Sequence, residues 1–300
     1  MARRALSLGA SVPLCVVIAV AAAVAGAVFT AAAIPVAGQS SATVPYRAPR
    51  AADGHPDLNG IWQALGEAHF DLEAHVARPA LALRAGPFGP VPAAPVLALG
   101  AVASVPPGMG VVDGGGAIPY KPDALATRNE NREHWIERDP EIKCYLPGVP
   151  RATYMPYPFQ ILQSNSALFI AYEYAGATRN ILMKDPGPPP VSSWMGQSVG
   201  RWDGDTLVVD VTGMNDSTWF DRSGNFHSDA VHVVERYTRT APDLISYQAT
   251  IEDSNVFTKP WTIKMPLYRR LDANVQLLDF KCVEFVEELL YGKWRKTPLK

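Results

Sequence analysis

The residues most able to transfer protons are grouped in the stretch 227–235. It contains His227, Asp229, His232 and Glu235, and imidazole and carboxylate groups are common general acids and bases near neutral pH. If these side chains converge on one pocket, they predict catalytic residues of a lyase, an isomerase or a hydrolase. On an extended strand His227 and Asp229 point to one side and His232 to the other, so this group does not predict a metal site.

A predicted hairpin decides which of these groups face the interior. Its strands are 231–239 and 244–252, joined by a turn that contains proline and aspartate. With this register Arg236 lies opposite Tyr247, and His232 shares their face, which is the more apolar one. An arginine and a histidine on an apolar face either orient a ligand in a cavity or are satisfied by carboxylates or solvent. A register slip of one residue exchanges the two faces.

Two further segments combine aromatic and cationic side chains. Across a turn at Gly176, Tyr172 and Arg179 fall on one face of a second hairpin, and such faces bind planar or anionic ligands or form surface cation–π pairs. Arg151 and Tyr154 lie in a turn bracketed by prolines, which suits functional groups as well as a structural turn. We therefore expect the ligand-binding residues to be Arg151, Tyr154, Tyr172, Arg179, Arg236 and Tyr247.

The segment Gly196–Gly200 matches G-x-S-x-G, the pattern around the nucleophile of many serine hydrolases. That pattern needs a strand before the serine and a helix after it. Here a proline-rich loop precedes Ser198 and a predicted hairpin follows it. The sequence therefore predicts a strand flanked by glycines rather than a nucleophile.

The N-terminus has the pattern of a secretion signal. Arg3 and Arg4 are followed by an almost wholly apolar stretch over 12–36 with small residues at its end. We expect a signal peptide over 1–38, a polar leader over 39–57, and a mature protein that is periplasmic or secreted. The apolar stretch is also long enough to span a bilayer. An uncleaved anchor is therefore the alternative, and it is the only membrane contact that we expect.

The charge balance excludes one large class of partners. The chain has 27 Lys and Arg against 29 Asp and Glu, a net charge of −2, and two of the basic residues fall in the signal. Such a chain has no basic surface for phosphate backbones, so no nucleic-acid partner is expected. The sequence also lacks a motif for a redox cofactor, and we expect no cofactor.

Cysteine usage agrees with export. Of the 3 cysteines, Cys15 falls in the predicted signal, which leaves Cys144 and Cys282. In an oxidising compartment two cysteines far apart in sequence favour a disulfide. Two buried free thiols are the alternative.

The rest of the chain predicts one mainly β domain over 58–300. Short apolar and aromatic runs alternate with turn residues in the C-terminal half, and about ten strands joined by short turns usually close into an antiparallel barrel or a sandwich. The last strand pair is expected at 261–268 and 274–283. A helix is expected over 121–138. The stretch 77–119, rich in Pro, Ala and Gly, is expected to be an insertion, either a lid or a contact surface.

Gly60 and Trp62 in the first predicted strand resemble the G-x-W opening of lipocalin-like (calycin) barrels. In that family the Trp closes one end of the barrel, and an Arg from a late strand packs over it. Arg269, Arg270 or Arg295 would take that place here. The resemblance implies a calycin-like barrel, although the long proline-rich insertion departs from a simple lipocalin.

Three sequence blocks resemble a large set of exported bacterial proteins of unknown function. The blocks are Lys143–Arg151, Gly200–Val211, and Glu252-Asp253 together with Lys259-Pro260-Trp261. This resemblance spans about 55–295, and it implies family membership without an activity.

Three functions follow from these patterns. The first is an exported barrel that binds a small, largely hydrophobic or aromatic molecule. The second is an acid–base enzyme that acts on such a molecule in the same cavity. The third is an envelope interaction protein that uses 77–119 as its contact surface.

Overall fold

The computed structural model describes residues 46–77, 83–92 and 105–282. The expected signal peptide (1–38) lies outside the described residues, as do residues 39–45 of the leader and two parts of the insertion. The described residues all belong to one compact unit, Tyr46–Lys300. Within them, no helix combines the length and the apolar character that are needed to cross a membrane.

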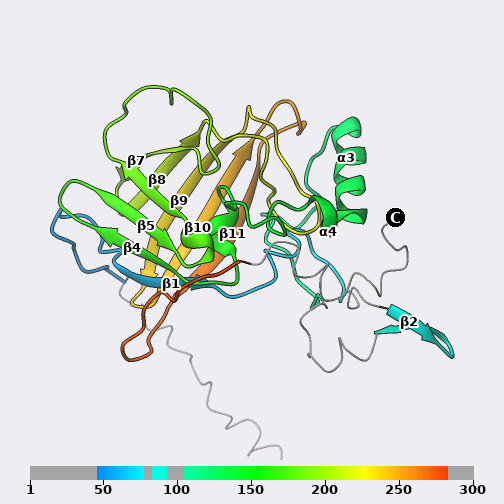
Figure 1. Cartoon of the computed structure of the whole chain (residues 1–300). Coiled ribbons are helices and arrows are strands. Elements are labelled where there is room, and N and C mark those ends of the chain that lie inside the picture. The colour runs from blue at the N-terminus through cyan, green and yellow to red at the C-terminus, as the bar shows by residue number, and fades with distance from the viewer. Residues whose placement is uncertain (1–45, 78–82, 93–104, 283–300) are drawn as a thin grey trace, which may run out of the picture. The chain divides into compact units, whose positions relative to one another are not determined.

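Nine of the described strands form a closed barrel, as Figure 1 shows. Around the barrel the strands follow the order β1-β11-β10-β9-β8-β7-β6-β5-β4. Their bounds are β1 Gly60–Ala64, β4 Phe159–Gln163, β5 Leu168–Tyr172, β6 Thr178–Leu182, β7 Gln197–Asp203, β8 Thr206–Thr212, β9 His232–Ala241, β10 Leu244–Glu252 and β11 Trp261–Arg269. The prediction of a mainly β barrel is confirmed.

One pair of neighbouring strands is parallel, and the number of strands makes this unavoidable. In a closed ring, all neighbours can be antiparallel only if the number of strands is even. The parallel pair is β6 and β7, which are joined at only two residue pairs, Ile181 with Ser198 and Leu182 with Val199. We call this short contact the seam. All other neighbouring strands of the barrel are antiparallel, as expected for a mainly antiparallel barrel.

The register of the β9–β10 hairpin differs from the expected one by one residue. Ile245 lies opposite Arg239, and Tyr247 lies opposite Tyr237. The register shifts between Leu244 and Ile245 next to the turn, where a bulge adds an unpaired residue. The expected pairing of Tyr247 with residue 236 is therefore wrong.

The shift changes which side chains of β9 face the barrel interior. Buried and partly exposed residues alternate along both strands, as they must where one face packs on a core. On β9 the buried positions are Val233, Glu235 and Tyr237. His232 and Arg236, which were expected on the inner face, lie on the outer one.

Trp62 on β1 packs against two arginines. It is fully buried, and the Arg269 guanidinium lies 4.5 Å above its ring centre. Arg239 lies 6.0 Å from the same ring. At Gly60 the backbone φ is +141°, and a Cβ there would lie 2.5 Å from Arg269 Nη1. The glycine and the tryptophan of G-x-W thus both serve the packing of one arginine.

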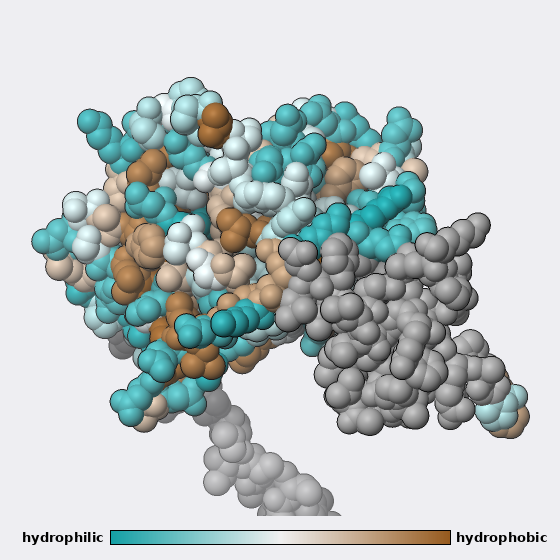
Figure 2. Space-filling model, viewed as in Figure 1, coloured by the Kyte–Doolittle hydropathy of each residue, from teal (hydrophilic) through white to brown (hydrophobic). Residues whose placement is uncertain are grey.

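Three short α-helical segments accompany the barrel in the part of the chain that the structure describes. The expected helix is confirmed as α3 (Pro122–Glu133) but ends at His134, whose φ and ψ of −110° and 27° are not helical. A single turn, α4 (Trp135–Arg138), follows. The exposed surface of α3 is hydrophilic (Figure 2). A shorter helix, α5 (Arg151–Tyr154), is buried and contacts β1.

The insertion contains a two-stranded ribbon of β2 (Leu83–Gly86) and β3 (Gly89–Pro92). Residues 78–82 and 93–104 of the insertion lie outside the described residues. Its expected role as a lid or contact surface stays a prediction.

The segment after β11 is not a strand, so the expected pairing of 261–268 with 274–283 is wrong. The reason is that β1 already pairs with the free edge of β11 to close the barrel. Residues 274–282, which we call the C-terminal strap, are mostly exposed instead. The predicted disulfide is confirmed, and it joins Cys282 to Cys144. Figure 1 shows the strap in orange to red beyond β11.

Candidate functional site

Buried polar side chains meet inside the barrel, and we call them the interior cluster. Its strand members occupy inward-facing positions, while one member comes from α5. Each is at most 3% exposed: Thr153, Tyr172, Arg179, Ser198, Glu235, Tyr237 and Tyr247. Burying such groups is costly unless they are hydrogen-bonded, so their contacts decide what the cluster can do.

Glu235 is the centre of the interior cluster. Arg179 Nη2 donates to Glu235 Oε2 at 2.6 Å. The hydroxyls of Tyr237 and Tyr247 donate to Glu235 Oε1 at 2.9 and 2.7 Å. The two tyrosines are directly opposite each other on β9 and β10, which lets both reach one oxygen. Hydrogen bonds to an ionised group are about twice as strong as neutral ones, so this carboxylate is firmly held.

Arg179 joins the carboxylate to two other strands. Its Nε and Nη2 donate to Ser198 Oγ at 3.2 and 2.8 Å, and its Nη1 donates to the Tyr172 hydroxyl at 3.2 Å. Burial alone lowers the pKa of the guanidinium, but Glu235, Tyr172 and Tyr237 together outweigh burial, so the pKa lies well above its ordinary value. Ser198 is therefore a hydrogen-bond acceptor on β7 and not an exposed nucleophile.

The tyrosines of the cluster stay protonated. Burial raises the pKa of Tyr237 and Tyr247, and the charge of Glu235 raises both further. Burial also raises the pKa of Tyr172, although Arg179 opposes it. The cluster therefore holds one cation, one anion and neutral hydroxyls. Such a set recognises a ligand through hydrogen bonds rather than through net charge.

A pocket of about 280 Å³ opens at the seam. Because only two residue pairs join β6 and β7, the strands have room to part there. Arg179 and Ser198 line the pocket from their inward-facing positions. The other lining residues are Thr178, Asn180, Leu182, Met195, Gly196 and Gln197. At Gly196 the φ is +62° and a Cβ would lie 2.7 Å from Thr212 O, so a side chain would not fit at this rim.

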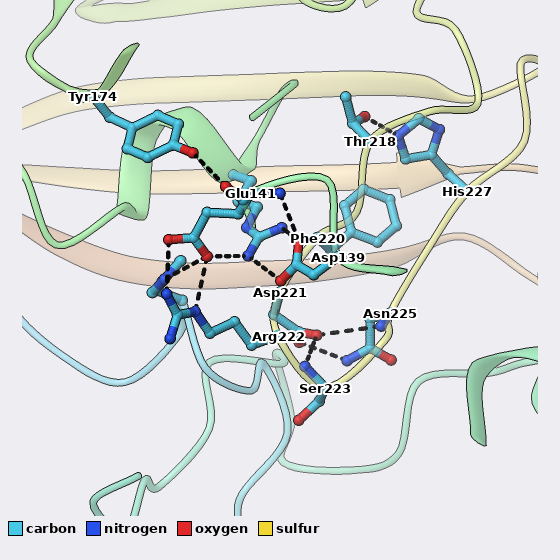
Figure 3. A network of polar contacts seen from close by, with 12 residues as sticks. Asp139, Glu141, Tyr174, Thr218, Phe220, Asp221, Arg222, Ser223, Asn225 and His227 are labelled. Carbon is cyan, nitrogen blue, oxygen red and sulfur yellow. Dashed lines mark hydrogen bonds and ion pairs between the residues drawn. The ribbon is translucent and has the colours of Figure 1, made fainter. Parts of the chain in front are cut away.

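A second set of buried polar groups lies beside Phe220, whose ring contacts Trp261 at the start of β11. We call it the end network. Loops rather than strands supply it, apart from one residue of α5. Its members are His69, Asp71, Asp139, Glu141, Arg151, Asp221, Arg222, Ser223 and Asn225. Figure 3 shows most of these residues converging.

Glu141 is the centre of the end network. Arg222 Nε and Nη2 donate to its two oxygens at 2.8 and 3.0 Å, and Arg151 Nη2 donates at 2.9 Å. Arg151 also donates to both oxygens of Asp139. Burial alone raises the pKa of Glu141, but Arg222, His69 and Arg151 outweigh it, so the pKa lies well below its usual range.

His69 has one nitrogen engaged and one free. Its Nε2 lies 3.1 Å from Glu141 Oε2. Burial lowers the pKa of His69 more than Glu141 raises it, so the ring is neutral. We assign the proton to Nε2, because that nitrogen faces a carboxylate. Nδ1 is then an unprotonated acceptor, and although it is buried, no described residue hydrogen-bonds to it.

Two acidic side chains share one buried site in the end network. Asp221 accepts hydrogen bonds from Leu72 N at 2.8 Å, Asn225 Nδ2 at 2.6 Å and Ser223 N at 2.9 Å. Asp71 accepts one from Ser223 Oγ at 2.6 Å. Burial, and then the charge of Asp71, raise the pKa of Asp221 to about 7. Asp221 therefore changes its protonation near neutral pH.

The barrel brings together four of the residues that the sequence singled out: Tyr172, Arg179, Glu235 and Tyr247. Arg151 belongs to the end network. Tyr154 lies beside that network, and its hydroxyl donates to Phe220 O at 2.9 Å.

His227 and Asp229 lie apart from the interior cluster. His227 is buried, and both ring nitrogens have partners: Thr218 Oγ1 lies 2.7 Å from Nε2, and Ser228 O lies 2.9 Å from Nδ1. Burial lowers the pKa of His227, so the ring is neutral. Asp229 is exposed.

His232 and Arg236 lie on the outer surface of β9. His232 is between Asp210 and Glu252, at 3.3 and 3.4 Å. Arg236 forms an exposed ion pair with Asp203 at 2.8 Å. Because of the one-residue register shift, neither faces the interior.

Sequence reasoning missed several residues of both sets. Tyr237 is two residues after Glu235, so alternation along β9 would have found it with the correct register. His69, Glu141 and Asp221 lie in loops without any periodic pattern, and no signal in the sequence pairs them.

Among the residues that the structure describes, no three His, Cys, Asp or Glu side chains are placed to hold a metal ion. Comparison with known proteins gives no match to a family model, to a curated protein or to a solved structure. The function must therefore be argued from the geometry.

Proposed function

We propose that this chain is an exported β-barrel protein that binds a small, largely hydrophobic molecule at the seam. The observation that carries the proposal is that Arg179, a buried residue of the interior cluster, is among the residues that line a pocket open to the outside. Leu182 and Met195 supply apolar wall, and Ser198 supplies a hydroxyl. Small-molecule sites combine apolar walls with polar groups that orient the ligand, and the lining of the seam pocket contains both kinds of residue.

The contacts of Arg179 indicate which kind of polar group the ligand carries. The pairing with Glu235 cancels the charge of Arg179. Contacts to described residues use four of the five guanidinium N–H groups, which leaves one on Nη1 to donate. A neutral acceptor, such as a carbonyl or hydroxyl oxygen, fits this arrangement better than a full anion.

Export is supported by two features. The pattern over 1–38 is typical of a signal peptide, and the Cys144–Cys282 disulfide is of the kind that forms outside the cytoplasm. We therefore place the mature protein in the periplasm or outside the cell. The packing of Arg269 over Trp62 supports the relationship to calycin barrels.

One observation favours a second function, an acid–base enzyme. The unprotonated Nδ1 of His69, held through Nε2 by the ionised Glu141, has the arrangement of a general base. In this case the substrate binds at the end network instead of the seam.

Native mass spectrometry of protein purified from its own host tests the two sites. We expect a copurified small molecule on the wild type that is lost in Asn180→Trp, because the exposed Asn180 lines only the seam pocket. Arg201→Trp is the matched control, at an exposed position of β7 that does not line the pocket, and it should keep the molecule.

The other outcomes are equally informative. A molecule retained by Asn180→Trp but lost in His69→Gln places the site in the end network. A wild-type protein that carries no molecule, and takes up none from a host lipid extract, contradicts both proposals.

A further inference from the structure

The C-terminal strap is fixed at its two ends and only lightly attached between them. One end continues from β11, and the other is tied by the disulfide between Cys282 and Cys144. Among its described residues, one hydrogen bond joins the strap to another part of the chain, from Leu278 N to Glu173 Oε2 at 2.8 Å. Phe280 adds ring contacts to Tyr157 and Tyr174, at 5.1 and 4.8 Å between ring centres.

A recess of about 510 Å³ lies between the strap and the turn that joins β5 to β6. Residues 277–281 line one side of it, and residues 171–173 and 175–178 line the other. Among the latter is Tyr172, whose hydroxyl accepts the hydrogen bond from Arg179. Thr178 lines both this recess and the seam pocket. The recess therefore borders β5, which carries Tyr172 of the interior cluster, and it adjoins the seam pocket at Thr178.

We propose that the C-terminal strap is a lid over this recess, and that it lifts about its two anchors to let a ligand reach the interior cluster. Opening breaks the Leu278–Glu173 hydrogen bond and separates Phe280 from its two tyrosines, while β11 and the disulfide hold. The lid rests on the proposed function, since it controls access to that site.

The walls of the recess indicate what passes under the lid. Leu277, Leu278 and Phe280 offer apolar surface on the strap side, and Glu173 and Thr178 offer polar groups on the other. The molecule is therefore amphipathic, with an aromatic or aliphatic body and one polar group. This matches the ligand class inferred at the seam.

Two variants loosen the lid without touching the interior cluster. Phe280→Ala removes the ring contacts, and Glu173→Ala removes the acceptor for Leu278. Phe169→Ala is the control, because Phe169 lies on the outer face of β5 and is 36% exposed, away from the recess.

Three readouts follow lid opening. The first is exchange of the Leu278 amide hydrogen by NMR, which we expect to be at least about tenfold faster in both variants. The second is alkylation of Ala177→Cys by iodoacetamide, because Ala177 lines the recess and is 2% exposed. Combined with Phe280→Ala, it should react about tenfold faster than alone. This readout needs no ligand, so it tests the lid even if the proposed binding function fails.

The third readout is binding of 6-propionyl-2-dimethylaminonaphthalene, an uncharged amphipathic aromatic probe with a carbonyl acceptor. A lid speeds association and dissociation by similar factors, so Kd should change less than about twofold in Phe280→Ala. A slower or unchanged association rate with faster dissociation makes Phe280 a ligand contact and overturns the lid. Unchanged alkylation of Ala177→Cys also overturns it. If the wild type binds no probe while alkylation responds as expected, the lid stands and the binding function fails.

Discussion

The interior cluster and the end network are both buried and both centred on a glutamate, but they are built in different ways. Strands carry the interior cluster, apart from one residue of α5, and its charges cancel within the Arg179–Glu235 pair. Loops carry most of the end network, where Glu141 meets two arginines and a histidine. Only the end network has a described group whose pKa is raised into the neutral range, Asp221.

The difference separates a rigid polar cluster from one that responds to pH. A barrel fixes the direction of each side chain through alternation and hydrogen-bonded register, so few contacts suffice to hold the interior cluster. Loops have no such regular register, so the ion pairs among its own side chains hold the end network together. Its stability therefore depends on protonation.

The largest effect should come from breaking the charge pair of the interior cluster. Arg179→Met leaves Glu235 buried with two tyrosine hydroxyls as partners, and removing one member of a buried pair costs about 3–5 kcal/mol. Urea unfolding with the disulfide intact measures the loss. The double variant Arg179→Met/Glu235→Gln should recover part of the stability, because no uncompensated charge is left. A double variant as unstable as the single one would show that the shape of Arg179, and not its charge, is what counts.

In the end network, Asp221→Asn should change the pH dependence of stability. The ordinary pKa of the group is 3.8, and in the folded protein it is about 7. Between these two pKa values the folded chain keeps a proton that the unfolded chain releases. The stabilisation that this proton supplies is therefore fully present below pH 3.8 and is lost as the pH rises through 7. Relative to the variant, the wild type should lose at most about 4 kcal/mol of unfolding free energy between pH 4 and 7, because a pKa difference of one unit corresponds to about 1.4 kcal/mol.

Urea unfolding at several pH values measures this slope, and His69→Gln is its control. His69 acts with the opposite sign, because its lowered pKa favours the folded state at high pH and weakens it as the pH falls below 6.5. Parallel curves for Asp221→Asn and the wild type would remove Asp221 as the source of the pH response.

A smaller effect is expected from Tyr247→Phe. It deletes one hydrogen bond to the Glu235 carboxylate, and a bond to a charged group contributes about 1.5–3 kcal/mol. Because burial and Glu235 raise the pKa of this hydroxyl, the loss should be the same at pH 5 and pH 8. Urea unfolding at pH 5 and pH 8 checks this. A loss of unfolding free energy that differed between the two pH values would show that the interior cluster also responds to pH.

The smallest effect should come from Arg236→Ala. Arg236 and Asp203 are exposed on the outer face of the barrel, and such pairs contribute about 0–1 kcal/mol. A loss of more than about 2 kcal/mol in thermal or urea unfolding would place Arg236 inside, as the sequence-based register had it.

The contrast between strands and loops also explains how much the sequence predicts. Alternation and turn residues predict the barrel, and they place Tyr172 and Arg179 together. The glycine and tryptophan of the first strand lead to the arginine that packs over Trp62, since Arg269 was among the three candidates. The first two predictions succeed because a strand imposes a fixed period on its side chains, whereas the arginine over Trp62 was expected only from the resemblance to calycin barrels.

Other features depend on information that is not local. One bulge at Leu244 and Ile245 exchanges the faces of β9 and moves Arg236 from the interior to the surface. The fate of residues 274–282 depends on whether β1 reaches β11, which no local pattern reveals. The end network joins His69, Glu141 and Asp221 from three loops, and pairs of this kind require the folded structure.

β1 pairs with β4 on one edge and with β11 on the other. The contact between Gln63 and Arg270 beside that closure spans 207 residues. Contacts so distant along the chain form slowly. β1 can pair with β11 only after β11 has been synthesised. During synthesis the barrel therefore stays open until almost the whole chain has been made. The order of the strands itself therefore delays closure of the barrel, and until then the edges of β1 and β11 remain unpaired with each other.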